Sequence, residues 1–143
     1  MLVVDTNLLV HAANTASPVH RQARAWLELK RSQPDSWYAT WPVLFEFMRV
    51  ATHPRVIRPP WTIERAWAFI AALLASPGFG VLVPTDRHAQ VAAQVFRELP
   101  LLAGNILHDA HTAILMREHG IRRICTRDTD FHRFPFLEVV DPL

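Results

Sequence analysis

The sequence predicts an α/β protein in which helices flank both faces of a mainly parallel sheet. Short apolar runs alternate along the chain with longer segments of helical periodicity, which is the order expected of parallel strands joined by helices. The run from Leu2 to Val4 is apolar at every position, as in a strand buried on both faces. The chain has 143 residues, 50% of them hydrophobic and 20% charged. We therefore expect residues 1–143 to form one domain with its own core.

After this first strand, the sequence predicts a helix, a short strand and a second helix. Ser17 and Pro18 are typical of a helix start, with serine as the N-cap and proline in the first helical position. Pro34 ends that helix, because proline cannot continue the hydrogen-bond ladder. A strand is expected at residues 37–39. The helix over residues 41–51 opens with a proline and stops before the next one.

The second half of the chain repeats the alternation of strands and helices. Thr62, Asp86 and Asn105 are small polar residues, typical of N-caps, and each precedes a segment of helical periodicity. The three predicted helices run to about residues 75, 99 and 119, and Gly120 ends the last of them. Strands are expected at residues 80–84, 122–126 and 137–140.

The five tryptophans divide into two groups by their sequence context. Trp26, Trp41 and Trp67 lie on apolar helical faces, so we expect them in the core. Trp37 and Trp61 flank loops, and we expect them to be exposed, for example at a dimer contact. For all five, a place in the core or in an interface is favoured over stacking on RNA bases.

The composition argues against a secreted or membrane protein. No basic leader precedes an apolar stretch at the N-terminus, so no secretory signal is expected. The longest apolar run, from Trp67 to Ala75, is far shorter than the about 20 residues that a membrane-spanning helix needs. Cys125 is the only cysteine, which excludes an intrachain disulfide and suits a reducing cytoplasm.

Two acids stand where predicted strands end. Asp5 directly follows the first strand, and Asp128 follows the strand at residues 122–126. Ligands of open parallel sheets bind outside the carboxyl ends of the strands, so both acids can face one crevice. Aspartate is also a common turn and cap residue, so neither acid alone indicates chemistry.

Glu46 lies in a helix that is apolar nearly all round, so we expect it to be largely buried. A buried carboxylate needs a compensating charge, because an unpaired one costs several kcal/mol. An ion pair with Arg49, three residues on, is one solution. A metal cation is the other, and this helix alone does not decide between them.

Asp109 falls in the first turns of the helix that Asn105 precedes, where an acid is favoured by the helix dipole. Taken with Asp5, Glu46 and Asp128, it makes a set of four acids on four separate elements. Acids that converge repel one another unless a divalent cation neutralises them. Ligands that are all oxygen favour Mg²⁺ or Mn²⁺ over Zn²⁺. The remaining nine of the 13 acids face 15 basic residues, so the rest of the surface is basic, as suits a nuclease.

Four segments resemble the motifs of PIN domains, in order along essentially the whole chain. They are VVDTN at residues 3–7, Glu46 in a helix after a short second strand, NILHDAHTA at residues 105–113, and TRDTDF at residues 126–131. The closing segments at residues 131–135 and 139–143 are similar to those of VapC-type toxins. His111 stands where the third motif is expected to be more apolar.

This resemblance implies an α/β/α sandwich and a Mg²⁺-dependent endoribonuclease, with Mn²⁺ as a possible substitute. A metal-activated water would hydrolyse RNA phosphodiester bonds. Asp5, Glu46, Asp109 and Asp128 would be the catalytic, metal-binding acids, with Asp130 as an auxiliary metal ligand. Supporting hydrogen bonds would come from Thr6, Asn7 and Thr126. The resemblance also implies a homodimer, and a cognate antitoxin that blocks the site of this toxin.

Two other functions fit parts of the sequence. Asp128 and Asp130 after a strand are similar to the paired acids of haloacid-dehalogenase-type phosphatases. In that fold the pair belongs on the first strand, and too few residues follow Asp130 for the rest of the core. A binding module for RNA or a protein partner, without catalysis, is the second alternative. The full set of four acids argues against it.

Overall fold

The computed structural model describes all 143 residues and contains one five-stranded sheet. Its strands are β1 (Leu2–Val4), β2 (Trp37–Thr40), β3 (Phe79–Leu82), β4 (Arg123–Cys125) and β5 (Glu138–Val140). They lie in the order β3-β2-β1-β4-β5, and every neighbouring pair is parallel. The predicted α/β class and mainly parallel sheet are therefore confirmed.

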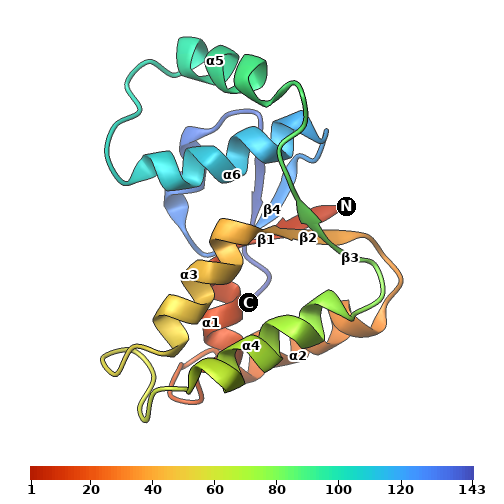
Figure 1. The fold of residues 1–143 in the computed structure, drawn as a ribbon, viewed down its shortest axis with the longest axis vertical. Coiled ribbons are helices and arrows are strands. Elements are labelled where there is room, and N and C mark those ends of the chain that lie inside the picture. Colours follow the sequence, from red (N-terminus) through yellow and green to blue (C-terminus); the bar gives the residue numbers. More distant parts are fainter.

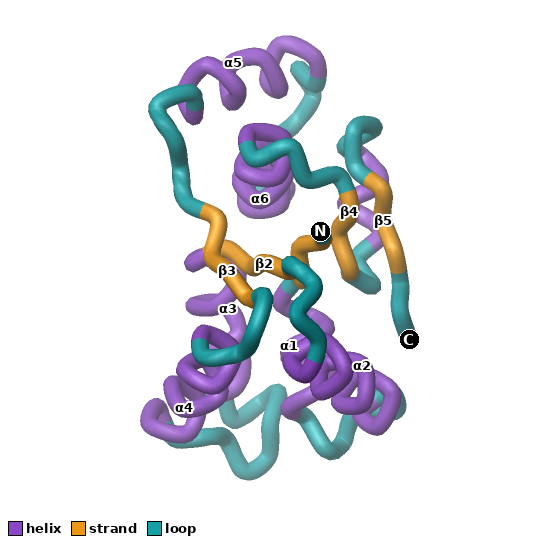
Figure 2. The backbone as a smooth tube through the Cα atoms, turned by 90° about the vertical axis from the view of Figure 1, so that its right-hand side faces the viewer, coloured by secondary structure: helices purple, strands orange, loops and turns teal.

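Helices cover both faces of this sheet, as Figures 1 and 2 show. They are α1 (Thr6–Ala13), α2 (His20–Ser32), α3 (Trp41–Ala51), α4 (Ile63–Leu74), α5 (His88–Glu98), α6 (Ile106–Glu118) and the short 3₁₀ helix η1 (Thr129–Arg133). Helices α1 to α4 lie on one side, whereas α6 lies on the other with α5 packed outside it. None of these helices has the length and hydrophobicity needed to cross a membrane.

The alternation of side chains along β1 divides the interior into two cores. Leu2 and Val4 point into the core formed with α1 to α4, whereas Val3 points into the core formed with α6. This arrangement follows from the two-residue period of a strand, and it explains why all three residues are apolar. The central strand is thus buried on both faces, as the sequence predicts.

The order of the strands reverses beside β1. The chain proceeds from β1 outward to β2 and β3, then returns to the other side of β1 to form β4 and β5. The carboxyl ends of β1 and β4 are therefore neighbours at the point where the order changes. In open parallel sheets this is where ligands bind.

Helix α1 is the one α-helix that the sequence reasoning did not predict; the short 3₁₀ helix η1 was not predicted either. It begins directly after β1, with Asp5 as its N-cap, and it buries Leu8, Leu9, Ala12 and Ala13 at helical spacing. The predicted cap at Ser17 is wrong: α2 starts three residues later, at His20, and has no side-chain cap. Ser17 instead accepts a hydrogen bond from the backbone N–H of Val19 and contacts the ring of His11.

The other predicted helix starts had mixed outcomes. Thr62 caps α4 by accepting a hydrogen bond from the backbone N–H of Arg65 at 3.2 Å. Asp86 does not cap α5, whose N-cap is Arg87, and Asn105 stands at the N-cap of α6 without a side-chain bond. Gly120 follows α6 with φ +70°, a conformation that glycine adopts without strain.

The tryptophans are distributed differently from the prediction. Trp37, expected to be exposed, is fully buried beside Phe79 in the sheet. Trp41 and Trp67, expected in the core, are partly exposed. Apolar periodicity does not distinguish the core face of a helix from an apolar face that remains on the surface.

Candidate metal-dependent active site

Asp5 is nearly buried, at 9% exposure, between the end of β1 and the start of α1. Its Oδ1 accepts a hydrogen bond from the backbone N–H of Thr6 at 2.7 Å. Its Oδ2 accepts from the side chains of Asn7 at 2.8 Å and Thr126 at 2.7 Å. Burial raises the pKa of Asp5; the bonds from Thr126 and Thr6 oppose this, and the charges of Asp128 and Glu46 add to it. The hydrogen bonds thus fix the position of the carboxylate, whereas burial and the neighbouring charges disfavour its ionised form.

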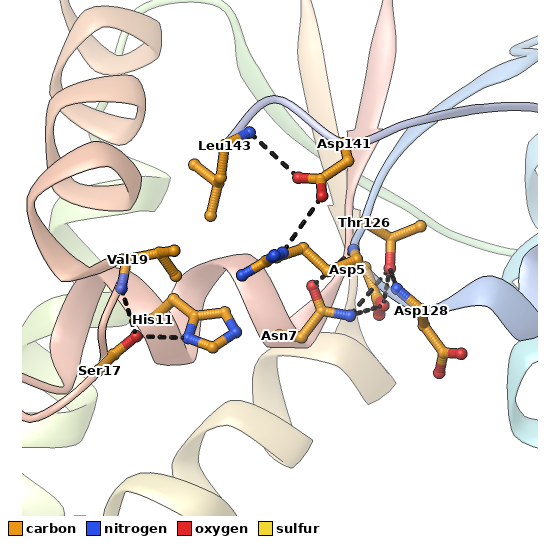
Figure 3. Close-up of polar contacts among 10 residues, drawn as sticks. Asp5, Asn7, His11, Ser17, Val19, Thr126, Asp128, Asp141 and Leu143 are labelled. Atoms are coloured by element: carbon orange, nitrogen blue, oxygen red, sulfur yellow. Dashed lines mark hydrogen bonds and ion pairs between the residues drawn. The ribbon is translucent and has the colours of Figure 1, made fainter.

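The hydroxyl of Thr126 links the two strand ends of the site, as Figure 3 shows. It donates to Asp5 Oδ2 and accepts from the side-chain amide of Asn7 at 2.8 Å and the backbone N–H of Asp128 at 2.9 Å. Asn7 completes the link, since its Oδ1 accepts from the backbone N–H of Arg127 at 3.1 Å. Threonine and asparagine are suited to this position because each both donates and accepts.

Thr6 contributes through a different contact. Its hydroxyl donates to the backbone carbonyl of Val43 in α3 at 3.3 Å, which ties the start of α1 to the helix that carries Glu46. The structure therefore places Thr6 as a connection between elements. Its backbone N–H, not its side chain, contacts an acid of the site.

Asp109, Asp128 and Asp130 form the tightest group of acids. Each offers one carboxylate oxygen, and these oxygens all lie within 4.8 Å of one another. Burial, followed by the charges of Asp5, Asp128 and Asp130, raises the pKa of Asp109 to about 6. The Asp128 carboxylate also caps η1, because its Oδ1 accepts from the backbone N–H of Asp130 at 2.9 Å. The turn that follows β4 thus brings two acids to Asp109 on α6.

Glu46 is less buried than the sequence predicts, because its side chain is 45% exposed. The prediction assumed that α3 is enclosed on all sides, whereas Trp41 and Phe45 on the same helix are exposed. Arg49 holds Glu46 through two contacts, at 2.8 Å and 2.6 Å. The hydrogen bonds from Arg49 lower the pKa of Glu46 against the opposing effect of burial. The ion pair with Arg49 that was considered for Glu46 is therefore present.

One polar cleft of about 650 Å³ connects these acids. Among its lining residues are Asp5, Thr6, Asn7, His11, Glu46, Arg49, Asn105, His108, Asp109, Thr112 and Asp128. We call this space the acid cleft. It contains all four acids predicted to be catalytic, which come from β1, α3, α6 and the turn after β4. Asp130 and Thr126 do not line it, although both contact residues that do.

Sequence reasoning assigned no site role to several polar residues that line the acid cleft, among them His11 and Thr112. His11 lies one helical turn after Asn7 on α1, so its place could have been predicted only together with that helix. Its Nδ1 contacts the hydroxyl of Ser17 at 2.7 Å (Figure 3). Thr112 lies three residues after Asp109 on α6, at a spacing that shares a helix face. Polar residues at these spacings from a candidate acid are the signal that could have found both.

The donor set fits a hard divalent cation. Every acid of the site offers oxygen, and the group at Asp109, Asp128 and Asp130 brings carboxylates close together without a basic side chain among its members. Burial first, and then repulsion from the neighbouring acids, raises the pKa of Asp109. A divalent cation would relieve this repulsion, and oxygen ligands favour Mg²⁺ or Mn²⁺.

Comparison with known proteins agrees with this geometry. A family model described as the PIN domain matches residues 2–137. Ribonuclease VapC33 of Mycobacterium tuberculosis is 34% identical over 143 residues, which cover 100% of this chain and 99% of the relative.

Solved structures share the fold at lower sequence identity. The crystal structure of Mycobacterium tuberculosis VapC20, described as a toxin that cleaves the sarcin-ricin loop, has a TM-score of 0.66 at 22% identity. The alignment covers 99% of this chain and 100% of that one. A toxin–antitoxin complex from Klebsiella pneumoniae has a chain with a TM-score of 0.64 at 20% identity, covering 100% of this chain and 98% of the other.

Proposed function

Because this chain belongs to the PIN-domain family, and within it to the VapC-type ribonucleases, we propose that it is a Mg²⁺-dependent endoribonuclease and the toxin of a toxin–antitoxin pair. One observation carries the proposal. Four acids from separate elements meet in the acid cleft, beside the point where the strand order reverses. Residues 1–143 act in this proposal as one nuclease domain.

The carboxylates of Asp5, Glu46, Asp109 and Asp128 would hold the cation, with Asp130 as the auxiliary ligand. When bound, a divalent cation supplies positive charge for the phosphodiester and lowers the pKa of a water. The chain's own groups keep the acids in place: Thr126 and Asn7 orient Asp5, and the backbone of the turn after β4 orients Asp128. This preorganisation avoids a cost of rearrangement during the reaction.

The partners follow from the same family membership. RNA is the proposed substrate. The proposed location is the cytoplasm, where the chain would meet this RNA. The toxin–antitoxin complex among the solved neighbours supports a cognate antitoxin as the protein partner. A homodimer is proposed on the family resemblance.

The test is RNA cleavage by the purified chain, freed of any bound partner, on a mixed pool of structured RNA. We expect discrete cuts with Mg²⁺ or Mn²⁺ and none in EDTA. Asp109→Asn should lower the rate at least about a hundredfold, because it removes an acid of the proposed metal site. Asp35→Asn is the matched control, since Asp35 is an exposed acid outside the acid cleft and should leave the rate unchanged.

Two results would contradict the proposal. Cutting that persists in EDTA and in Asp109→Asn would exclude a metal-dependent reaction in the acid cleft. Absence of cutting, together with no Mn²⁺ binding by calorimetry, would favour a module that binds RNA or protein without catalysis.

A further inference from the structure

Arg49 occupies both carboxylate oxygens of Glu46. Its Nε donates to Oε2 at 2.8 Å and its Nη2 to Oε1 at 2.6 Å. Both residues line the acid cleft, and they lie three positions apart on α3. Glu46 is also absent from the group of close oxygens that Asp109, Asp128 and Asp130 form. Both oxygens of the Glu46 carboxylate therefore contact its own helix neighbour.

We propose, on the basis of the proposed function, that Arg49 is a phosphate-positioning residue that Glu46 holds until the site is loaded with its cation. While the acids hold no cation, the guanidinium neutralises Glu46. When Glu46 turns to the cation, the guanidinium becomes free to bind a phosphate oxygen of the RNA. The same side chain thus has two alternative anionic partners in one cleft.

The ion pair is well suited to such an exchange because it is exposed. The side chain of Arg49 is 66% exposed and that of Glu46 is 45% exposed. Solvent screens pairs of this kind strongly, so opening the pair costs little. A buried pair could not release its arginine without leaving an uncompensated charge.

The charges of the acid cleft give the freed guanidinium a role. A phosphodiester that enters meets four acids, and Arg49 is the only arginine among the lining residues. A guanidinium stays charged at any physiological pH and presents parallel donors that match two phosphate oxygens. Arg49 is therefore the lining side chain best equipped to hold the backbone of an RNA strand.

A purely structural role for the pair is the competing explanation. Residues of opposite charge three apart on a helix can stabilise it slightly, whatever the cleft binds. In that case Arg49 would influence the stability of α3 and leave metal binding through Glu46 unaffected. The two explanations differ in whether the effect of Arg49 on metal affinity depends on Glu46.

Calorimetric titration with Mn²⁺ distinguishes them in four proteins: the unmodified chain, Glu46→Gln, Arg49→Gln and the double variant. We expect Arg49→Gln to bind Mn²⁺ about three- to fivefold more tightly, because the competing pair is lost. In the Glu46→Gln background the same change should alter the affinity by less than about 1.5-fold. Arg55→Gln is the charge-matched control, since Arg55 is exposed outside the acid cleft, and should leave the affinity unchanged.

A measurement of RNA binding tests the second proposed partner of Arg49, the RNA phosphate. The probe is a fluorescent single-stranded RNA with phosphorothioate linkages that resist cleavage, and binding is followed by anisotropy. With saturating Mn²⁺ we expect Arg49→Gln to weaken binding about fivefold, and in EDTA less than about twofold. Arg49→Lys should restore only part of the loss, because an ammonium lacks the paired donors.

Each contrary result has a separate meaning. Unchanged Mn²⁺ affinity in Arg49→Gln, or an equal gain with and without Glu46, overturns this inference and leaves the ribonuclease standing. A loss of RNA affinity in Arg49→Gln that is the same in EDTA and in Mn²⁺ also overturns it. If the unmodified chain binds no Mn²⁺ while folded by circular dichroism, the proposed metal-dependent function fails and the inference fails with it.

Discussion

The pKa of Asp109 reflects its burial in the acid cleft and, after that, the charges of the neighbouring acids. Burial, reinforced by the charges of Asp5, Asp128 and Asp130, raises this pKa from an ordinary 3.8 to about 6. The folded chain therefore binds more protons than the unfolded chain between about pH 4 and pH 6. A group with a raised acidic pKa destabilises the folded state once it ionises, so stability falls as the pH rises through this window.

Asp109→Asn should consequently stabilise the chain in EDTA. Asparagine has the same shape and no charge, so at pH 7.5 we expect a gain of about 1 kcal/mol, a figure reduced for the partial exposure of the group. The gain should shrink toward zero at about pH 4, where Asp109 is protonated in the folded state. Urea unfolding at both pH values measures this. A variant that is less stable at pH 7.5 would contradict the repulsion derived from the geometry.

The residue types of the site could be predicted from the sequence better than their environments. Asp5 and Asp128 were recognisable because each follows a predicted strand, and the structure brings both to the acid cleft. The exposure of Glu46 could not be predicted, because whether α3 is enclosed depends on which elements pack around it. A sequence pattern shows which residues are apolar on a helix, but not how many neighbours that helix has.

At the scale of elements, Glu118 joins α6 to the segment that follows β3. Its buried carboxylate accepts hydrogen bonds from the hydroxyl of Thr85 and, at 2.5 Å, from the backbone N–H of Thr85. His88 at the start of α5 contacts it at 2.7 Å. Burial raises the pKa of Glu118, but the bonds from Thr85 and His88 outweigh it and lower this pKa to about 2. The charged form is thus the one that the fold stabilises.

Glu118→Gln should destabilise the chain by about 2 kcal/mol at pH 7, since a charged acceptor is lost from a buried network. Because the folded pKa lies below the ordinary 4.5, this stability is complete above about pH 4.5 and is lost as the pH falls toward 2. The difference in the free energy of unfolding between the unmodified chain and Glu118→Gln should narrow over that range, as measured by urea unfolding. Glu98→Gln is the control, because Glu98 is exposed in its pair with Arg117 and should contribute much less to stability. Equal losses from the two variants would refute the role of burial.

The helix caps give a direct comparison between sequence pattern and structure. Asp86 is by type the better N-cap residue of the two, yet only Thr62 accepts a bond from its helix. Thr62→Ala should therefore cost about 1 kcal/mol, and Asp86→Ala less than about 0.5 kcal/mol. Thermal unfolding of the two variants checks this, and a reversed order would show that the caps are wrongly assigned.

The positions of helices were more predictable than their starts. Periodicity identified α3 over Trp41–Ala51, because proline and apolar spacing agree there. Helix α1 was missed because Asp5 ends a strand and caps a helix at once, which leaves no turn residues between the two. Ser17 failed as a cap because its hydroxyl contacts His11, which lies in another element. Such contacts depend on tertiary packing and are invisible to local patterns.

At the scale of the whole molecule, the acid cleft exists only because the strand order reverses. Asp5 and Asp128 are far apart in the sequence, and the parallel pairing of β1 with β4 makes them neighbours. Asp109 arrives from the other face of the sheet on α6, and Glu46 from the first face on α3. A cation bound by these acids would therefore connect both layers of helices at the carboxyl ends of the central strands.

Metal binding should accordingly stabilise the entire fold and not one element. A ligand that binds only the folded chain adds about 1.4 kcal/mol when its concentration is ten times its Kd. We expect Mn²⁺ at that level to raise the melting temperature of the unmodified chain by a few degrees, about 2–5 °C. Asp35→Asn should respond equally, whereas Asp128→Asn should not respond.

Hydrogen exchange should then show slower opening in both α3 and α6, because both carry ligands. Protection confined to the segment around Asp128 and Asp130 would mean that the cation binds the turn alone and that the four acids do not act as one site.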